Sequence, residues 1–428
     1  MRVIRLAARS SPCFRESPVT IHTHAFANGL TLLAEPMPWL ESAALTLLLP
    51  AGCSRDPDDR SGLASLACEL AQRGSGKRDS RQFIEDLERL GCDASASVAA
   101  AHTSFGGAMP AENLGETLDI FADLTRRPHL SDDQFDDARQ SCIQEVLALE
   151  DELSTRALHR LRSRHYPSPW GKSSLGTVPS LEATALDEVQ RFVASQYQPT
   201  NAIMSVAGKF DWAWLLDKVG RHWGDWQPVP LAVQATGEPL GGYEHIPHES
   251  SQTHIWMAYD SVPYSHPDYY EARAAVGVMS DGMSSRLFTE VRENRGLCYS
   301  VSAFCHSLRD RGSIFGYAGT TTERAQETWD VMLAEFQKLS AGVTDAELSR
   351  LKAALKSALI MQQESSASRT GSMASDWYHL GRVQTIEELS QIVNGLSVDR
   401  INRYLAAHPV RKLSVVTLGA QPLQIATA

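Results

Sequence analysis

The sequence predicts an α+β protein of two homologous domains, each a mainly antiparallel sheet with helices packed on one face. Three observations support this prediction: a duplicated sequence, alternating apolar strands early in each copy, and helical segments that cluster after those strands. A stretch rich in proline and glycine, without helical period, separates the copies as a linker. We therefore divide the chain into a lead-in (1–19), an N-terminal repeat (20–225), a linker (226–250) and a C-terminal repeat (251–428).

The duplication is visible in two pairs of segments. "SRQFIEDLERLGCDASASV" (80–98) matches "SRLFTEVRENRGLCYSVSA" (285–303), and "FGGAMPAENLGETLDIFADL" (105–124) matches "FGYAGTTTERAQETWDVMLAEF" (315–336). The second copy has a longer loop around "SLRDRGS" (307–313). Agreement in both order and residue type indicates one structural unit used twice.

Both copies show the same succession of elements. Apolar strands come first, and an apolar helix, a charged amphipathic helix, a strand of small residues and long helices follow. The predicted strands are 30–37, 43–52 and 92–109 in the first copy and 253–260 and 298–318 in the second. The predicted helices are 61–72, 80–90, 111–125 and 131–165 in the first copy, and 267–280, 285–294, 322–340 and 344–366 in the second.

Composition narrows the class of protein. The chain has 428 residues and is 43% hydrophobic, which suffices for two or three domains of about 150–200 residues each. The net charge of −11 argues against a nucleic-acid partner, and no apolar run approaches the roughly 20 residues that span a bilayer. Seven cysteines without C-x-x-C pairing predict reduced thiols and a cytoplasmic protein. An N-terminal stripe of Arg2, Arg5 and Arg9 leaves import into an organellar matrix as the alternative.

The helix predicted at 61–72 carries a pattern typical of a metal site. Ser65, Cys68 and Glu69 lie at i, i+3 and i+4, which places them on one helical face. Two of these three side chains have the wrong chemistry for zinc. The pattern therefore indicates a metal-binding helix that no longer holds a metal.

Three longer segments carry a resemblance to a known family. They are "AGCSRDPDDRSGLASLACEL" (51–70), "YQPTNAIMSVAGKF" (197–210) and "GMSSRLFTEVRENRGLCYSVSAF" (282–304). Together they resemble the pitrilysin/insulinase family of zinc peptidases, which includes bacterial two-domain processing peptidases, mitochondrial processing peptidase and core subunits of the cytochrome bc1 complex. The resemblance runs from about residue 24 to 420. It implies two domains that close like a clamshell around a peptide chamber.

The resemblance also shows what this chain lacks. The family's H-x-x-E-H motif holds zinc with two histidines and a later glutamate, and its first glutamate is the general base. Aligned through "SGLA", the histidines fall at Ser65 and Glu69, the base at Cys68 and the third ligand at Glu145. We therefore expect no metal and no cofactor in this chain, with Cys68 a buried thiol and both glutamates solvated or paired with an arginine. An unorthodox metal site of Cys68, Glu69 and Glu145 is the alternative.

A second family feature is kept. Arg292 and Tyr299 match an Arg-x6-Tyr pair that, in the family, faces zinc across the chamber. The resemblance implies that the arginine grips a substrate carbonyl and the phenol stabilises the oxyanion. The matching place in the first repeat, near Asp93, cannot do this. The alternative is a surface arginine paired with a nearby acid and a strand tyrosine packed on a helix.

These features predict a non-catalytic, substrate-binding subunit of a heterodimeric zinc metalloendopeptidase. A homologous partner would supply zinc and H-x-x-E-H, this chain would supply Arg292 and Tyr299, and an extended peptide would bind by adding a strand to a sheet edge. Two alternatives remain open. One is an assembly scaffold like the respiratory core subunits, and the other is a peptidase that uses the unorthodox metal site.

Overall fold

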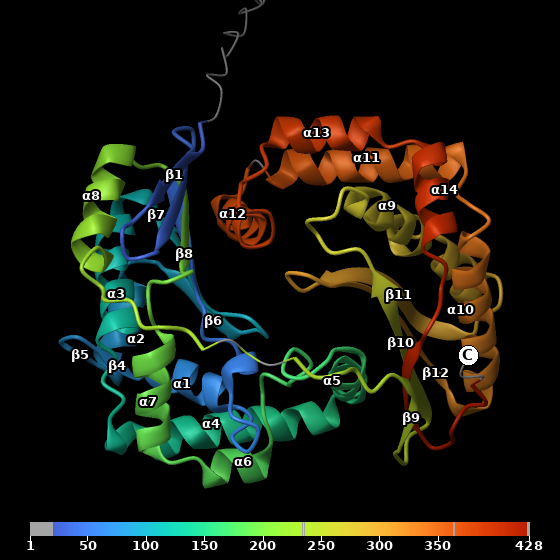
Figure 1. The fold of residues 1–428 in the computed structure, drawn as a ribbon, viewed down its shortest axis with the longest axis horizontal. Coiled ribbons are helices and arrows are strands. Elements are labelled where there is room, and N and C mark those ends of the chain that lie inside the picture. The colour runs from blue at the N-terminus through green and yellow to red at the C-terminus, as the bar shows by residue number, and fades with distance from the viewer. Residues whose placement is uncertain (1–19, 233, 235, 363, 426–428) are drawn as a thin grey trace, which may run out of the picture.

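The structure, a computed structural model, describes residues 20–232, 234, 236–362 and 364–425. The lead-in predicted at 1–19 lies outside these residues. In the described part, helices and strands form two mixed sheets of six and five strands with helices packed over them, which confirms the α+β prediction. The two sheets stand opposite each other, one in each half of the chain (Figure 1).

The strands of the first sheet, in spatial order, are β1 (His22–Ala25), β2 (Thr31–Pro36), β8 (Ile203–Gly208), β3 (Ser42–Leu49), β7 (Thr103–Pro110) and β6 (Asp93–Val98). Those of the second sheet are β9 (Gly242–Pro247), β13 (Ser414–Gly419), β10 (Gln252–Ser261), β12 (Gly312–Thr321) and β11 (Cys298–Ser307). A short ribbon of β4 (Gly74–Ser75) and β5 (Arg78–Asp79) lies outside both sheets.

The two sheets repeat one topology. β2, β8, β3, β7 and β6 correspond in order to β9, β13, β10, β12 and β11. In both sheets the first of these pairs is parallel, and the other neighbouring strands are antiparallel. Equal strand order and direction are what a duplicated unit produces. The residue boundaries of the two repeats stay predictions.

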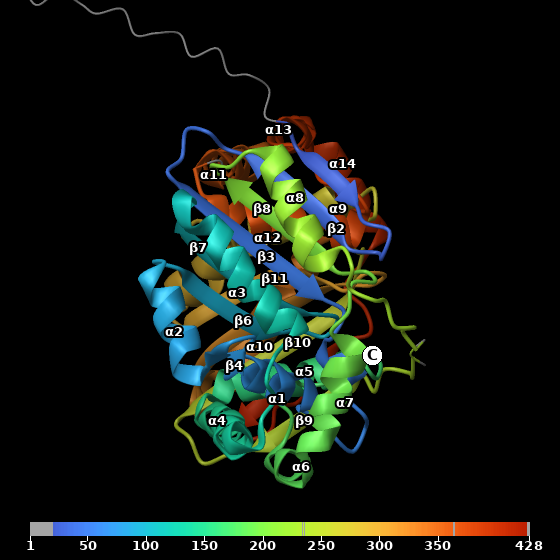
Figure 2. The same cartoon turned by 90° about the vertical axis from the view of Figure 1, so that its left-hand side faces the viewer.

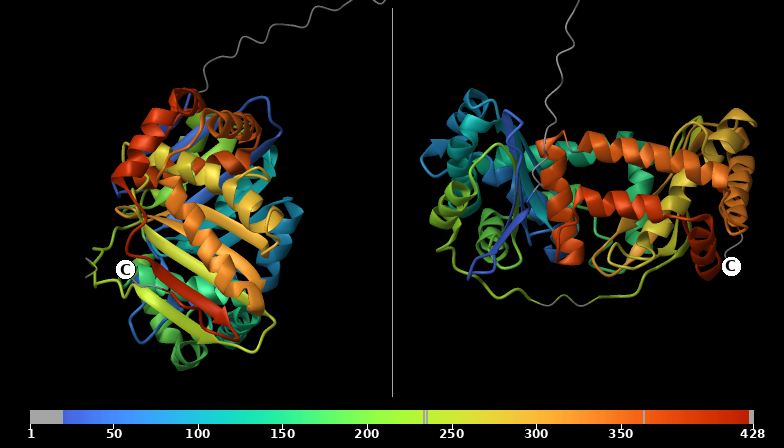
Figure 3. Two further views of the ribbon diagram at one scale, coloured as in Figure 1. Left: turned by 90° about the vertical axis from the view of Figure 1, so that its right-hand side faces the viewer. Right: turned by 90° about the horizontal axis from the view of Figure 1, so that it is seen from above.

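Helices pack around the two sheets. In the first half they are α1 (Leu63–Ala71), α2 (Ser80–Arg89), α3 (Leu114–Arg126), α4 (Asp132–Asp151), α5 (Leu153–His165), α6 (Val178–Ala183), α7 (Leu186–Gln196) and α8 (Trp212–Trp223). In the second half they are α9 (Tyr269–Ser280), α10 (Ala325–Leu339), α11 (Asp345–Gln362), α12 (Ser366–Leu380), α13 (Ile386–Gly395) and α14 (Val398–Ala407). Figure 2 shows α3 and α8 over the first sheet, and Figure 3 shows α10 over the second. In the described part of the chain, no helix combines the length and apolar character needed to cross a membrane.

Both segments of small residues are hairpins, so the prediction of one strand each was wrong. The segment 92–109 forms β6 and β7, and 298–318 falls within β11 and β12. In the first hairpin, the turn consists of Ala99, Ala100, Ala101 and His102. It was missed because it has no glycine or proline to interrupt the pattern.

Two further segments differ from the prediction. The linker 226–250 contains β9, because residues 242–247 pair in parallel with β13. The helix predicted at 131–165 breaks at Glu152, whose φ of −90° and ψ of 74° are not helical. Glu152 thereby separates α4, which packs on α1, from α5, which packs on the sheet of the other half of the molecule.

Each half also places one helix on the inner face of the other half's sheet. α12, from the C-terminal half, packs on β3 and β8, and α5, from the N-terminal half, packs on β10 and β13 (Figure 1). Successive side chains along β3 point to opposite faces of the sheet, so this strand can pack on both sides. Leu45 and Leu47 face the outer core, whereas Leu48 packs in the cluster beneath α12 and the Thr46 hydroxyl donates to Thr370 at 2.9 Å.

Polar contacts fix α5 on the second sheet. The indole of Trp256 donates to the carbonyl of Ser154 at 2.8 Å. The ring nitrogens of His165 lie 2.8 Å from the Ser313 hydroxyl and 3.1 Å from the Ser414 hydroxyl. The two halves are therefore joined through α5 and α12 as well as through the linker.

Candidate functional site

Asp56 positions the helix that corresponds to the family's zinc helix. Its two carboxylate oxygens accept the backbone N–H groups of Gly62 and Ala64, both at 2.8 Å, and so satisfy free donors at the start of α1. Gly62 has a φ of +95°, and a Cβ there would lie 2.9 Å from the carbonyl oxygen of Leu175. Sequence reasoning missed the role of Asp56, because the cap lies seven residues before the helix and is separated from it by a loop.

Ser65 and Glu69 are engaged in structural contacts. The Ser65 hydroxyl donates to the carbonyl of Ser174 at 2.7 Å. One carboxylate oxygen of Glu69 accepts from Arg73 at 2.8 and 3.1 Å, and the same guanidinium donates to Ser141 on α4 at 2.8 Å. Both positions that hold histidine in the family therefore help to pack α1 in this chain.

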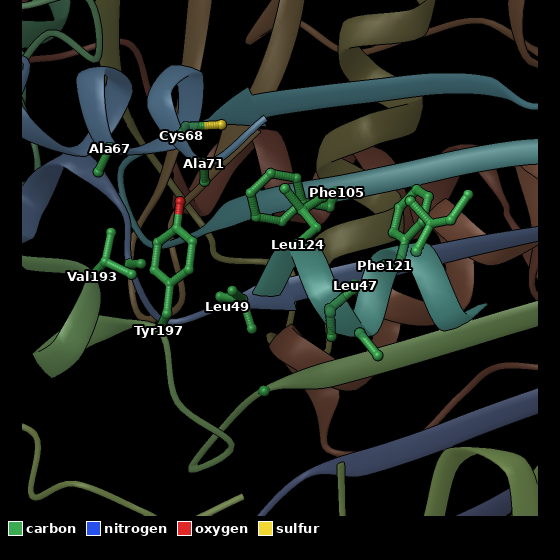
Figure 4. Close-up of a cluster of buried hydrophobic side chains, with 14 of the residues drawn as sticks. Leu47, Leu49, Ala67, Cys68, Ala71, Phe105, Phe121, Leu124, Val193 and Tyr197 are labelled. Carbon is green, nitrogen blue, oxygen red and sulfur yellow. The ribbon is translucent and has the colours of Figure 1, made fainter. Parts of the chain in front are cut away.

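Cys68 belongs to the hydrophobic core. Its side chain is only 5% exposed and lies on α1 among Ala67, Ala71 and Tyr197 (Figure 4). Burial, together with the charges of Glu69 and Glu145, raises the pKa of the thiol far above its usual range, so the group stays protonated. A protonated thiol is a poor metal ligand and cannot replace a general base.

The four remnant positions do not fit a zinc ion. The set has no imidazole, Ser65 and Glu69 are already engaged, and Cys68 is protonated. Burial and the negative charge of Glu69 raise the pKa of the Glu145 carboxyl group. Within the described ranges, no three His, Cys, Asp or Glu side chains converge as a metal site requires. We therefore derive no chemical step through zinc in this chain.

Arg292 and Tyr299 lie together in the second half. Arg292 is on a π-helical turn, Phe288–Glu293, and its guanidinium carbon lies 4.7 Å from the ring centre of Phe288 and 5.1 Å from that of Tyr299. Such cation–π contacts hold the guanidinium between the two rings. Its ion pair is with the adjacent Glu293, 3.6 Å away.

Tyr299 is available to another molecule. It lies at the start of β11 and is 85% exposed, so its ring is not packed into the core. β11 is an edge strand of the second sheet, and β6 is the corresponding edge strand of the first. Edge strands present unpaired backbone groups to which an extended peptide can add. The remnant positions lie on α1 and α4 in the first half, apart from this pair.

The carboxyl group of Asp56 should make stability depend on pH. Burial raises its pKa from 3.8 to about 7, against the lowering effect of its hydrogen bonds and of Lys172. The folded state then binds the proton more tightly than the unfolded state, so the contribution of Asp56 is largest below pH 4 and is lost as pH rises through 7. We expect the free energy of unfolding of the wild type to fall, relative to that of Asp56→Asn, by at most about 1.4 kcal/mol per pH unit in this window.

Chemical denaturation at several pH values measures this effect. Asp58→Asn is the matched control, because Asp58 pairs with the same lysine, Lys172, at 2.9 Å but is exposed. Equal pH profiles for the wild type and Asp56→Asn would contradict the prediction.

Restoring the family's residues should restore a metal site. We expect the triple variant Ser65→His, Cys68→Glu and Glu69→His to bind about one zinc per chain, because Glu145 supplies the third ligand and α1 keeps its backbone. Metal analysis after dialysis checks this result, with the wild-type chain as control. Zinc retained equally by both proteins would contradict the assignment of the remnant positions.

Known proteins share sequence features and fold with this chain. Residues 33–178 match the family described as "Insulinase (Peptidase family M16)", and residues 184–355 match "Peptidase M16 inactive domain". An uncharacterized zinc protease of Rickettsia felis is 24% identical over 376 residues, covering 87% of this chain and 91% of its own.

Solved structures share the fold over nearly the whole chain. The M16 inactive domain from Pseudomonas fluorescens superposes with a TM-score of 0.87 at 20% identity, covering 96% of this chain and 100% of that one. A chain of complex III2 from Candida albicans superposes with a TM-score of 0.81 at 18% identity, covering 94% and 96%. The two family matches lie in consecutive parts of the chain and share one fold, and the chain therefore belongs to the insulinase (M16) peptidase family, as a member with a degenerate zinc motif.

Proposed function

We propose that this chain is the non-catalytic, substrate-binding subunit of a heterodimeric zinc metalloendopeptidase. The observation that supports it is the contrast between the two parts of the site. The residues at the zinc positions pack the helix, whereas Tyr299 is exposed at an edge strand and the half-buried Arg292 lies against its ring. A homologous chain with H-x-x-E-H would supply the metal.

Arg292 and Tyr299 would act on the peptide bond that the partner attacks. The guanidinium of Arg292, held between two rings, would bind a substrate carbonyl oxygen, and the hydroxyl of Tyr299 would donate to the negative oxygen that forms during attack. The peptide would lie extended and add to β6 or β11, whose outer edges are free of strand neighbours in the two sheets. The arrangement therefore supports substrate binding and charge stabilisation without a metal in this chain.

The packing of α5 and α12 on the sheets of the opposite halves affects how such a chamber would close. Because α5 and α12 each pack on the opposite sheet, the two halves of this chain would move together. We propose that the chamber closes between this chain and its partner.

We also propose that the complex is located in the cytoplasm, because Cys53, Cys68, Cys92, Cys142, Cys298 and Cys305 are free thiols.

The alternative function is an assembly scaffold. The fold similarity to a chain of complex III2 favours it as the second candidate. The two functions differ in one respect that can be measured, because a scaffold has no need of an exposed tyrosine that contacts Arg292.

Purification of the native complex tests the proposal. We expect a homologous chain with H-x-x-E-H to co-purify, and we expect peptide hydrolysis by the mixture of both chains but not by this chain alone. Recovery of a stable complex without such a chain would favour the scaffold. Hydrolysis by this chain alone would overturn the proposal.

A further inference from the structure

A cavity of about 660 Å³ lies where the two halves meet. Its lining combines the turn after β6, the turn between β11 and β12, the end of α12, and Arg55. These segments are all far apart in the sequence. The cavity therefore forms only when the two halves and α12, which packs on the sheet of the opposite half, are assembled.

The lining of the cavity is positively charged. Arg55, Arg309 and Arg311 line it, and Asp310 is the one carboxylate among its described lining residues. None of the three arginines forms an ion pair within the described part of the chain. The guanidinium of Arg55 donates to the backbone carbonyl of Ala232 at 2.5 Å. Three arginines without carboxylate partners contrast with the net charge of −11.

Aromatic groups orient one arginine and add hydrogen-bonding capacity. The guanidinium carbon of Arg309 lies 5.9 Å from the ring centre of Tyr378 on α12. The ring centres of His102 and the same tyrosine lie 4.2 Å apart in a T-shaped arrangement. Burial, with the charges of His379 and Arg309, lowers the pKa of His102 to about 4, so the imidazole is neutral and can donate or accept a hydrogen bond.

We propose that this cavity binds a carboxylate group of the peptide substrate. The inference rests on the proposed function, because it takes the ligand to be a peptide. Arginine side chains bind carboxylates through two parallel hydrogen bonds, which is the recognition that Arg309 and Arg311 offer. Ala101 and His102 line the cavity and lie at the end of the turn that joins β6 to β7. A peptide added to the edge of β6 would therefore bring its next residues towards the arginines.

The carboxylate has two possible sources, a C-terminus and an acidic side chain. Ala-Ser peptides that carry an uncharged, carboxylate-free fluorophore separate them: one with a free C-terminus, one amidated with a single internal glutamate, and one amidated without any carboxylate. Fluorescence anisotropy measures their affinity for the isolated chain, so neither a partner nor catalysis is needed. We expect at least one carboxylate peptide to bind about tenfold tighter than the uncharged one, as charge-assisted hydrogen bonds do.

Arg309→Gln with Arg311→Gln should abolish this preference. The matched control is Arg403→Gln with Arg411→Gln, which removes two exposed arginines of the same half that do not line the cavity. Tyr299→Phe should keep the preference, so the cavity and the Arg–Tyr pair are tested separately. Equal affinity for all three peptides, or an equal loss of preference in the control variant, would overturn the inference. If the reconstituted mixture nevertheless cleaved peptide, the proposed function would stand without it.

Discussion

Tyr299→Phe in this chain should lower the turnover of the complex with its zinc-bearing partner by about 10²–10³-fold, because one oxyanion donor is lost. The hydroxyl is absent in the variant while the ring, 85% exposed, keeps its contact with Arg292. Thermal unfolding and complex assembly should therefore be unchanged. Steady-state kinetics on the reconstituted complex, together with a thermal melt, measure both quantities.

Arg292→Ala should in addition raise KM, because the guanidinium binds the ground-state carbonyl as well as the transition state. Tyr243→Phe is the matched control. The hydroxyl of Tyr243 lies 2.9 Å from that of Thr417 and also accepts the backbone N–H of Leu423, so its loss should reduce stability without changing turnover. Unchanged turnover in Tyr299→Phe would leave this chain as a scaffold.

The parts of this fold that the sequence could predict are those that depend on local residue patterns. The alternation of residue types along 43–49 predicts a strand with two different faces, as β3 has. The matched segments 80–98 and 285–303 predict two sheets of equal strand order. The spacing of Ser65, Cys68 and Glu69 places them on one helix, as observed.

The remaining features depend on long-range packing. An amphipathic helix shows that it covers an apolar face but not which face, so nothing in 153–165 or 366–380 indicates that these helices cross to the opposite sheet. The break at Glu152 is a consequence of that crossing. The sequence does not predict the arginine-lined cavity either, because Arg55 and Arg309 line one cavity only when the two halves are assembled.

Arg369→Met should lower the free energy of unfolding by about 3–5 kcal/mol, the usual cost of removing one partner from a buried ion pair. Arg369, on α12, donates to Glu35 on β2 at 2.7 Å, and the two side chains are 1% and 4% exposed. Methionine fills much of the volume of arginine but leaves Glu35 buried without a cation. We also expect α12 to detach more readily from the first sheet, so that limited proteolysis cleaves near 363–366 sooner.

The second variant, Glu35→Gln with Arg369→Met, distinguishes charge from packing. If the cost comes from an unpaired buried charge, the double variant should recover most of the lost stability, since neither group is then charged. Arg382→Met is the matched control, because Arg382 follows α12 directly and pairs at 3.0 Å with Glu388, yet the two side chains are 56% and 45% exposed. An exposed pair contributes under about 1 kcal/mol. Equal losses in Arg369→Met and Arg382→Met would show that the contact between α12 and the first sheet depends on its apolar residues, such as Met373 and Ala374, and not on the ion pair.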